Sequence, residues 1–267
     1  MKFRIASEGF FSIRRETGSL IAAAIHAGHE LRPDLAELTA LDEETRLREE
    51  DPFTDGWLGL APNRIAVSAS RFEVDLNRPR EAAVYLGPDQ AWGMEPWREP
   101  LPRALIAASL ERWDRFYREV ERLVGEVVER EGAALLIDLH SYCHRRAGPG
   151  APPDDPDLDP EINLGTESID RRRHGAALDV FAGRLRDFDF GGRGLDVREN
   201  VRFRGGHFPR WVNARFGGRA CAIAVEVKKV FMDEWTGRLD RRAHRLLGEA
   251  LAGAARAAEA ELVRNES

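Results

Sequence analysis

The most hydrophobic stretch of the chain reads Ala134-Leu-Leu-Ile-Asp-Leu139, and it runs directly into His140-Ser-Tyr142. A short aliphatic run with polar residues at its ends is typical of a strand that is buried on both faces of a sheet. The runs 20–25 and 220–227 have the same character, and Phe72–Leu76 is a shorter, alternating candidate. The sequence therefore predicts a central sheet made of buried strands.

Long helical patterns separate these strands. Between residues 101 and 130, apolar side chains recur at three- and four-residue steps, and Gly132 follows where a helix is expected to end. Residues 239–262 repeat this pattern with many alanines. Strands that alternate with helices favour parallel βαβ connections. We predict one α/β domain over residues 1–267, with three layers and a mixed, mainly parallel central sheet.

Composition limits the class of protein. The 267 residues are 43% hydrophobic, which is enough for a packed core, and 46 acidic against 40 basic residues give a net charge of −6. Two cysteines are too few for a disulfide framework or a cysteine zinc site. No apolar run is long enough to span a membrane, and the first residues lack a signal-peptide core. We expect a soluble, cytoplasmic protein that binds neither nucleic acid nor membrane.

One segment interrupts the alternation of strands and helices. Residues 147–160 read AGPGAPPDDPDLDP, and a segment with five prolines forms neither a helix nor a central strand. A loop of this length is usually functional or disordered. It begins a few residues after His140, so a rim over a site and a mobile surface loop both remain open.

Two histidine clusters follow predicted strands. The first is His26-Ala-Gly-His29-Glu30, in which His26 and Glu30 share one face if the chain forms a helix there, and His29 is the competitor in a tighter turn. The second is Asp138-Leu-His140, in which Asp138 lies on the same side of the strand and is placed to orient a ring nitrogen. Ligands gather at the carboxyl ends of strands in such sheets, so the two clusters together predict a metal site.

A buried acid supplies a candidate general base. Glu226 lies within the apolar run Ile223-Ala-Val-Glu-Val227, where a carboxylate is costly unless it is paired or lies near a cation. As a general base, Glu226 would take a proton from a water activated by a metal and pass it to the leaving amine. A salt bridge with an arginine is the alternative.

Two further segments are candidates for binding an anionic substrate. Asn77 and Arg78 lie in Asp75-Leu-Asn-Arg-Pro-Arg80, and a guanidinium beside an amide is suited to a carboxylate, with Asp75 as a brace. Residues 200–207 combine arginines with two glycines that allow backbone amides to approach an anion. Arg204 is the candidate there, and for Arg202 a surface position is the favoured interpretation.

These clusters, in this order, resemble the N-formylglutamate amidohydrolase family. The matching pieces are HAGHE at 26–30, VDLNRPRE at 74–81, LLIDLHSY at 135–142, NLGT at 163–166, VRENVRFRGG at 197–206 and VEVKKVFMDE at 225–234. They extend over nearly the whole chain. That family belongs to the superfamily of zinc carboxypeptidases and aspartoacylase, whose motifs are similar to the same segments.

The resemblance implies a fold and a catalytic site. The implied fold is the zinc carboxypeptidase type, and the implied cofactor is one Zn²⁺ per chain, held by His26, Glu30 and His140. Glu226 is implied as general base and then acid. For the substrate carboxylate, the resemblance implies Asn77 with Arg78, and it suggests Arg204.

The expected activity is zinc-dependent hydrolysis of the amide bond of an N-acyl amino acid, with N-formyl-L-glutamate as the leading example. The only partner expected is this small-molecule substrate. Two other functions remain open, a metallocarboxypeptidase that acts on peptides and a ligand-binding protein that keeps the fold without catalysis. The sequence leaves the acyl group and the oligomeric state open.

Overall fold

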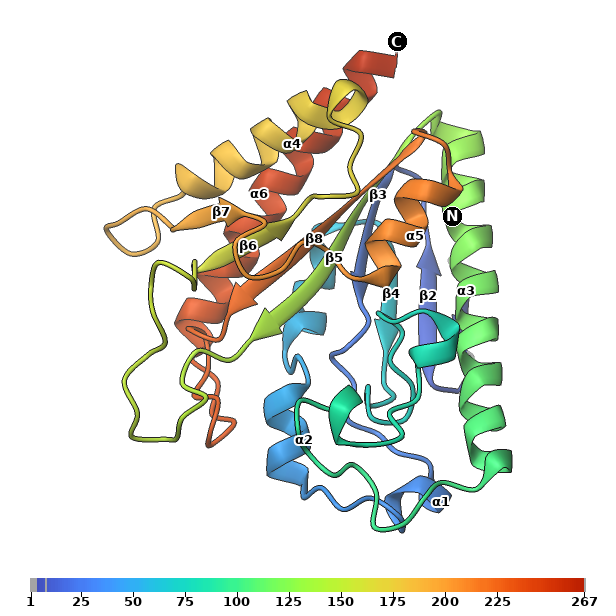
Figure 1. The fold of residues 1–267 in the computed structure, drawn as a ribbon. Coiled ribbons are helices and arrows are strands. Elements are labelled where there is room, and N and C mark those ends of the chain that lie inside the picture. The colour runs from blue at the N-terminus through green and yellow to red at the C-terminus, as the bar shows by residue number, and fades with distance from the viewer. Residues whose placement is uncertain (1–3, 8, 267) are drawn as a thin grey trace.

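A computed structural model describes residues 4–7 and 9–266 of the chain and shows one mixed sheet (Figure 1). Its strands are β1 (Arg4–Ser7), β2 (Phe11–Arg15), β3 (Leu20–Ala24), β4 (Asn63–Val67), β5 (Ala134–Tyr142), β6 (Ile162–Gly165), β7 (Val197–Glu199) and β8 (Ala220–Lys228). Their order across the sheet is β1-β2-β4-β3-β5-β8-β6-β7. The central strands β4, β3, β5 and β8 are parallel, while β2 and β6 join them antiparallel on either side.

Helices cover both faces of the sheet (Figure 1). One face carries α3 (Arg103–Glu131) and α5 (His207–Arg215), and the other carries α4 (Arg171–Arg186) and α6 (Arg241–Glu266). The remaining elements are short: α1 (Pro33–Ala36), α2 (Glu43–Glu49) and the 3₁₀ helices η1 (Thr54–Leu60), η2 (Arg80–Ala82) and η3 (Pro88–Gln90). The prediction of a single three-layer α/β domain with a mainly parallel sheet is therefore confirmed.

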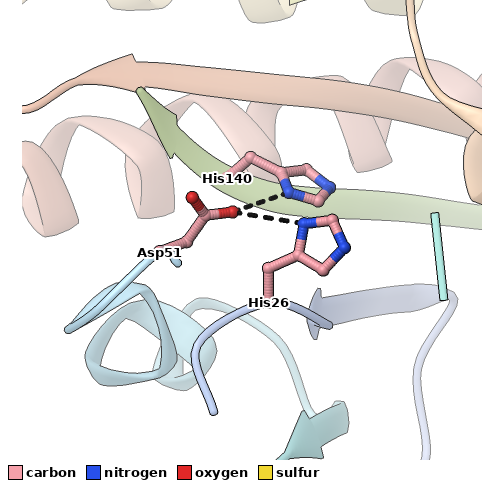
Figure 2. Close-up of side chains that lie close together, drawn as sticks. All are labelled: His26, Asp51 and His140. Atoms are coloured by element: carbon pink, nitrogen blue, oxygen red, sulfur yellow. Dashed lines mark hydrogen bonds and ion pairs between the residues drawn. The ribbon is translucent and has the colours of Figure 1, made fainter. Parts of the chain in front are cut away.

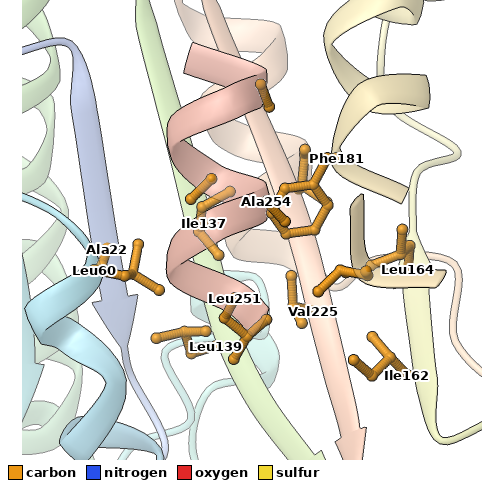
Figure 3. Close-up of a cluster of buried hydrophobic side chains, with 14 of the residues drawn as sticks. Ala22, Leu60, Ile137, Leu139, Ile162, Leu164, Phe181, Val225, Leu251 and Ala254 are labelled. Atoms are coloured by element: carbon orange, nitrogen blue, oxygen red, sulfur yellow. The ribbon is translucent and has the colours of Figure 1, made fainter. Parts of the chain in front are cut away.

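Alternation along the central strands decides which side chains reach the site. In β5, Ile137 and Leu139 pack into the core beneath α4 and α6, as Figure 3 shows, whereas Leu136 belongs to the core beneath α3 and α5. Successive side chains of a strand point to opposite faces, so Asp138 and His140 follow Leu136 onto the α3 and α5 face. Glu226 follows Ala222 onto the same face in β8. The three polar residues thus share one face of two neighbouring strands.

The three long aliphatic runs form β3, β5 and β8, as predicted, and the two helical patterns form α3 and α6. The prediction of a strand at Phe72–Leu76 is wrong. The segment is folded into turns, with the Glu73 amide bonded to the Ser70 carbonyl and the Asp75 amide bonded to the Ala83 carbonyl. Buried Asp75 needs hydrogen-bond donors around its carboxylate, and this turn supplies them where a flat strand would not. None of the helices within residues 4–7 and 9–266 is long and apolar enough to cross a membrane.

A close backbone contact joins β6 to the loop before α5. A Cβ added to Gly165 would lie 2.4 Å from the backbone nitrogen of Gly205, so the two segments approach each other only because residue 165 has no side chain. We expect Gly165→Ala to lower the free energy of unfolding by about 1–3 kcal/mol in chemical denaturation. Gly183→Ala in α4 is the matched control, because its Cβ meets nothing within 4 Å. Gly183→Ala should stabilise the protein by up to about 1 kcal/mol. Equal changes in the free energy of unfolding for the two variants would contradict the close contact at Gly165.

Candidate active site

Three buried side chains converge at the carboxyl ends of the parallel strands (Figure 2). His26 follows β3, His140 lies in β5, and Asp51 lies between α2 and η1. The Asp51 carboxylate is 2.9 Å from Nδ1 of His140 and 3.5 Å from Nδ1 of His26. One possible ligand atom from each residue lies within 4.8 Å of the others. Two nitrogens and one oxygen at this spacing form a candidate site for a metal ion.

Each histidine also contacts a second carboxylate through its other ring nitrogen. Nε2 of His26 is 2.8 Å from Oδ1 of Asp75, and Nε2 of His140 is 2.9 Å from Oδ2 of Asp138. These carboxylates orient both rings so that the Nδ1 atoms face Asp51. The contact between Asp138 and His140 that the strand alternation predicts is therefore present.

The charges of the cluster shift its pKa values strongly. Burial alone would raise the pKa of Asp51, but the hydrogen bond from His140 and the nearby ring of His26 hold it well below the usual range. Burial alone would lower the pKa of His140, but Asp138 and Glu226 raise it well above the usual value. Nδ1 of His26 is buried, lies 3.5 Å from the Asp51 carboxylate and makes no hydrogen bond among the described residues. This nitrogen beside an ionised carboxylate fits a metal ion bound between the three residues.

Glu226 stands beside the cluster on the neighbouring strand. Its Cα is paired with that of His140 across β5 and β8, and its side chain lines the same cavity as His26 and His140. Burial is the largest influence on its carboxyl group and raises its pKa to about 7. A carboxyl group with this pKa can accept and release a proton near neutral pH.

Asn77 is held in place by the start of α5. Its side-chain oxygen accepts a hydrogen bond from the Phe208 amide, and its Nδ2 lies 3.5 Å from Nε2 of His140. A Cβ on Gly206 would lie 2.2 Å from the Asn77 side-chain oxygen, so glycine is required for this approach. The structure thus brings Asn77 to the histidine cluster, as the sequence predicts.

The cavity in front of these residues has a volume of about 660 Å³ and a basic wall. Arg71, Arg202 and Arg204 line it. Arg204 is mostly exposed and pairs with Glu167 at 3.0 Å. Arg202 pairs with buried Asp159, so the 147–160 loop reaches the rim of the cavity through this ion pair.

Arg78 occupies a different place from the one expected. It lies over the ring of Tyr85, with 4.4 Å between the guanidinium carbon and the ring centroid, and it is not among the residues that line the cavity. Arg71 lines the cavity and bonds Asp75 at 2.9 Å. Of these two arginines, only Arg71 lines the cavity.

Glu30 is not brought to the histidines, and the carboxylate that lies beside them is that of Asp51. The spacing argument for Glu30 required a helix after His26, but the chain is extended there and bridges to Ala69. Gly28 lies directly against the backbone of Ser68, which a side chain would prevent. The Glu30 carboxylate bonds the Ser68 hydroxyl, away from the cluster.

His29, the other alternative, also lies outside the cluster of His26, Asp51 and His140 and bonds Glu50 at 2.5 Å. Sequence reasoning missed Asp51 because it is one of six acids between residues 43 and 55 and has no distinctive spacing to either histidine.

Comparison with known proteins places the chain among the amidohydrolases. The family model of N-formylglutamate amidohydrolase matches residues 18–232. The chain therefore belongs to the N-formylglutamate amidohydrolase family, as its motifs indicated. No curated protein matches the sequence significantly.

Two solved structures share the fold over nearly their full length. N-formylglutamate amidohydrolase from Ralstonia eutropha JMP134 aligns with a TM-score of 0.75 at 17% identity, over 96% of this chain and 98% of that one. A gene product of Agrobacterium tumefaciens aligns with a TM-score of 0.64 at 16% identity, over 91% and 95% of the two chains. At these identities the likeness establishes the fold.

The raised pKa of Glu226 predicts a pH-dependent stability of the metal-free protein. Below the usual pKa of 4.5 the carboxyl group is protonated in both the folded and the unfolded chain. As pH rises from there through about 7, the unfolded chain ionises first and stability is lost. The full loss is on the order of 3 kcal/mol. Glu226→Gln should abolish this loss. In the presence of a chelator, the free energy of unfolding of the variant should therefore rise relative to that of the wild type as pH increases from about 4.5 to about 8. An unfolding free-energy difference that is independent of pH would contradict the assigned pKa.

Proposed function

We propose that this protein is a zinc-dependent hydrolase of N-acyl amino acids, with N-formyl-L-glutamate as the leading substrate. The observation that carries the proposal is the buried cluster of His26, Asp51 and His140 beside Glu226 at the end of the parallel strands. Membership of the N-formylglutamate amidohydrolase family supports both the class of reaction and the leading substrate. The fold shared with N-formylglutamate amidohydrolase from Ralstonia eutropha JMP134 is consistent with this choice.

The proposed ligands of the zinc ion are Nδ1 of His26, Nδ1 of His140 and the carboxylate of Asp51. Two histidines and one carboxylate are a known donor set for catalytic zinc, and they leave one position open. When bound there, zinc would polarise the acyl carbonyl and lower the pKa of a water molecule towards ~7. Asp75 and Asp138 fix the rings of the two histidines from behind, which strengthens them as ligands.

Glu226 moves the proton in the proposed reaction. Its carboxylate accepts a proton from the attacking water and passes it to the amide nitrogen as the carbon–nitrogen bond breaks. Its burial beside His140 raises its pKa to about 7, so it holds and releases this proton without a large energetic penalty at neutral pH.

The substrate carboxylates would meet the basic wall of the cavity. We assign the α-carboxylate to Asn77 together with Arg71, because both line the cavity and both contact residues that also hold the histidines. Arg204, which is exposed at the rim, is assigned to a second carboxylate such as that of a glutamate side chain. Arg78 acts indirectly in this scheme, since its Nε lies 3.5 Å from the carboxylate of Asp75.

Metal content tests the cofactor. We expect about one zinc ion per chain in the purified protein, and we expect this metal to be absent from His140→Ala and from Asp51→Asn. Glu30→Gln should retain it, because Glu30 lies outside the cluster. Metal retained in Asp51→Asn but lost in Glu30→Gln would reverse the ligand assignment. A wild-type protein that binds no divalent metal would contradict the whole proposal.

Substrate length tests the reaction. We expect release of formate from N-formyl-L-glutamate, loss of this activity in chelator, and a drop in kcat of a factor of 100 or more in Glu226→Gln. Arg71→Met should raise KM by about tenfold or more, since a charge-assisted contact contributes about 1.5–3 kcal/mol. Cleavage of peptides with a C-terminal glutamate, without hydrolysis of N-acyl amino acids, would instead favour a carboxypeptidase. Binding without turnover of either substrate would favour a ligand-binding protein.

A further inference from the structure

One buried cation next to the site has no role in the proposed reaction. Lys229 lies one residue after β8 and is only 1% exposed, yet no carboxylate forms an ion pair with it among residues 4–7 and 9–266. Burying an ammonium group without an opposite charge is costly unless its hydrogen bonds are fully used. Lysine is also rare in this chain, where it occurs only at positions 2, 228 and 229. A residue so costly and so unusual in this composition requires an explanation.

The hydrogen bonds of Lys229 converge on the end of one short helix. Its Nζ donates to the carbonyl of Arg48 at 2.6 Å and to the carbonyl of Glu50 at 2.8 Å, and it lies 3.6 Å from Sγ of Cys143. Helix α2 ends at Glu49, and the last carbonyls of a helix have no partner within it. A cation at this position satisfies these carbonyls and the negative end of the helix dipole.

A second cation binds the carbonyl between them. Nη1 of Arg71 donates to the carbonyl of Glu49 at 3.2 Å, and Nη2 of the same residue donates to Asp75, the carboxylate behind His26. The three successive carbonyls of residues 48–50 are therefore all bound by buried or largely buried cations. Arg71 in addition connects this segment to the His26 side of the site.

The next residue after this clamped segment is Asp51. Its amide donates to the carbonyl of His26 at 3.0 Å, and its own carbonyl accepts the hydroxyl of Thr54 at 2.8 Å. Asp51 follows a helix of only seven residues and belongs to no strand. Its position relative to His140 thus depends on contacts from outside its own segment. The amide of Lys229 bonds the carbonyl of Tyr142, which ties the lysine to the end of the strand that carries His140.

We propose that Lys229 is a positioning residue that holds the Asp51 carboxylate in place for metal binding. It does so by binding the carbonyls at the end of α2 from the position directly after the strand that carries Glu226. The inference rests on the proposed function, because it takes Asp51 as a ligand. It extends that function to a residue that touches neither the metal nor the reacting atoms.

The test compares Lys229→Met with Lys228→Met. Both changes remove one buried lysine from the same segment, but the Lys228 side chain is near Glu161 and is not among the residues that line the cavity. We expect the dissociation constant for zinc, measured by competition with a chelator, to rise about ten- to hundredfold in Lys229→Met. It should stay near the wild-type value in Lys228→Met and return towards it in Lys229→Arg, which keeps the charge and the donors.

Two further readouts separate positioning from other roles. In the metal-free protein, hydrogen exchange of the amides in residues 46–54 should become faster in Lys229→Met, while the amides of β5 keep their protection. Excess zinc should restore most of the activity, because the variant keeps Glu226 and the substrate-binding residues. A raised KM that excess zinc does not correct would instead make Lys229 a substrate-binding residue and overturn the proposal.

The outcomes also distinguish this inference from the function on which it rests. If wild-type protein binds no zinc, the proposed function fails, while hydrogen exchange still reports whether Lys229 clamps residues 46–54. If wild-type protein binds zinc and Lys229→Met binds it equally well, only the positioning role is overturned. Should Lys229→Met not fold, Lys229→Gln, which keeps one amide donor group, is measured by the same criteria.

Discussion

The carboxylate of Asp51 lies between the Nδ1 atoms of two buried histidines, 2.9 Å from His140 and 3.5 Å from His26, and the surrounding structure is arranged to keep it there. A buried carboxylate is unfavourable on its own, so the groups around it must supply charge and hydrogen bonds. The two histidines supply them directly. Asp75 and Asp138 contact those histidines from behind, and Lys229 and Arg71 donate hydrogen bonds to the carbonyls that precede Asp51.

This network explains why so many charged groups are buried in one region of the protein. Asp75 accepts hydrogen bonds from His26, from Arg71 and from the amide of Asn77, so one carboxylate orients three residues of the site. Burial would raise its pKa, but the charge of Arg71 and the contact with His26 hold it well below the usual value. Glu226 is the exception, because burial raises its pKa and no direct hydrogen-bond partner opposes this effect among the described residues. This contrast suits the carboxyl group of Glu226 to transfer protons and the carboxylate of Asp75 to remain charged.

Residues carried by the long strands were predictable because strand geometry is local. His140, Asp138 and Glu226 were found from the aliphatic runs around them. Alternation places Asp138 and His140 on one face, and the pairing of β5 with β8 sets Glu226 beside them. His26 was predictable because it lies just past the carboxyl end of the aliphatic run that forms β3. Asn77 was found through its neighbours in the motif, and the glycine at position 206 allows it to approach.

The residues that sequence reasoning misplaced all lie in segments between regular elements. Glu30 is four residues after His26, but Gly28 packs against the backbone of Ser68 and the chain is extended there. The four-residue spacing therefore does not bring the two side chains to the same face, as it would in a helix. Arg71 and Arg78 flank the segment Phe72–Leu76, which is folded into turns where a strand was predicted, and the path of these turns decides which guanidinium faces the cavity.

The sequence by itself determined the layered α/β fold, the strand ends that carry the site and the chemistry of the residues on those strands. Only the tertiary structure placed Asp51 and not Glu30 beside the histidines, Arg71 and not Arg78 on the cavity wall, and Lys229 at the end of α2. The reason is physical: the periodicity of a strand acts over a few residues, whereas the path of a loop depends on contacts such as that between residues 50 and 229, which are distant in the chain.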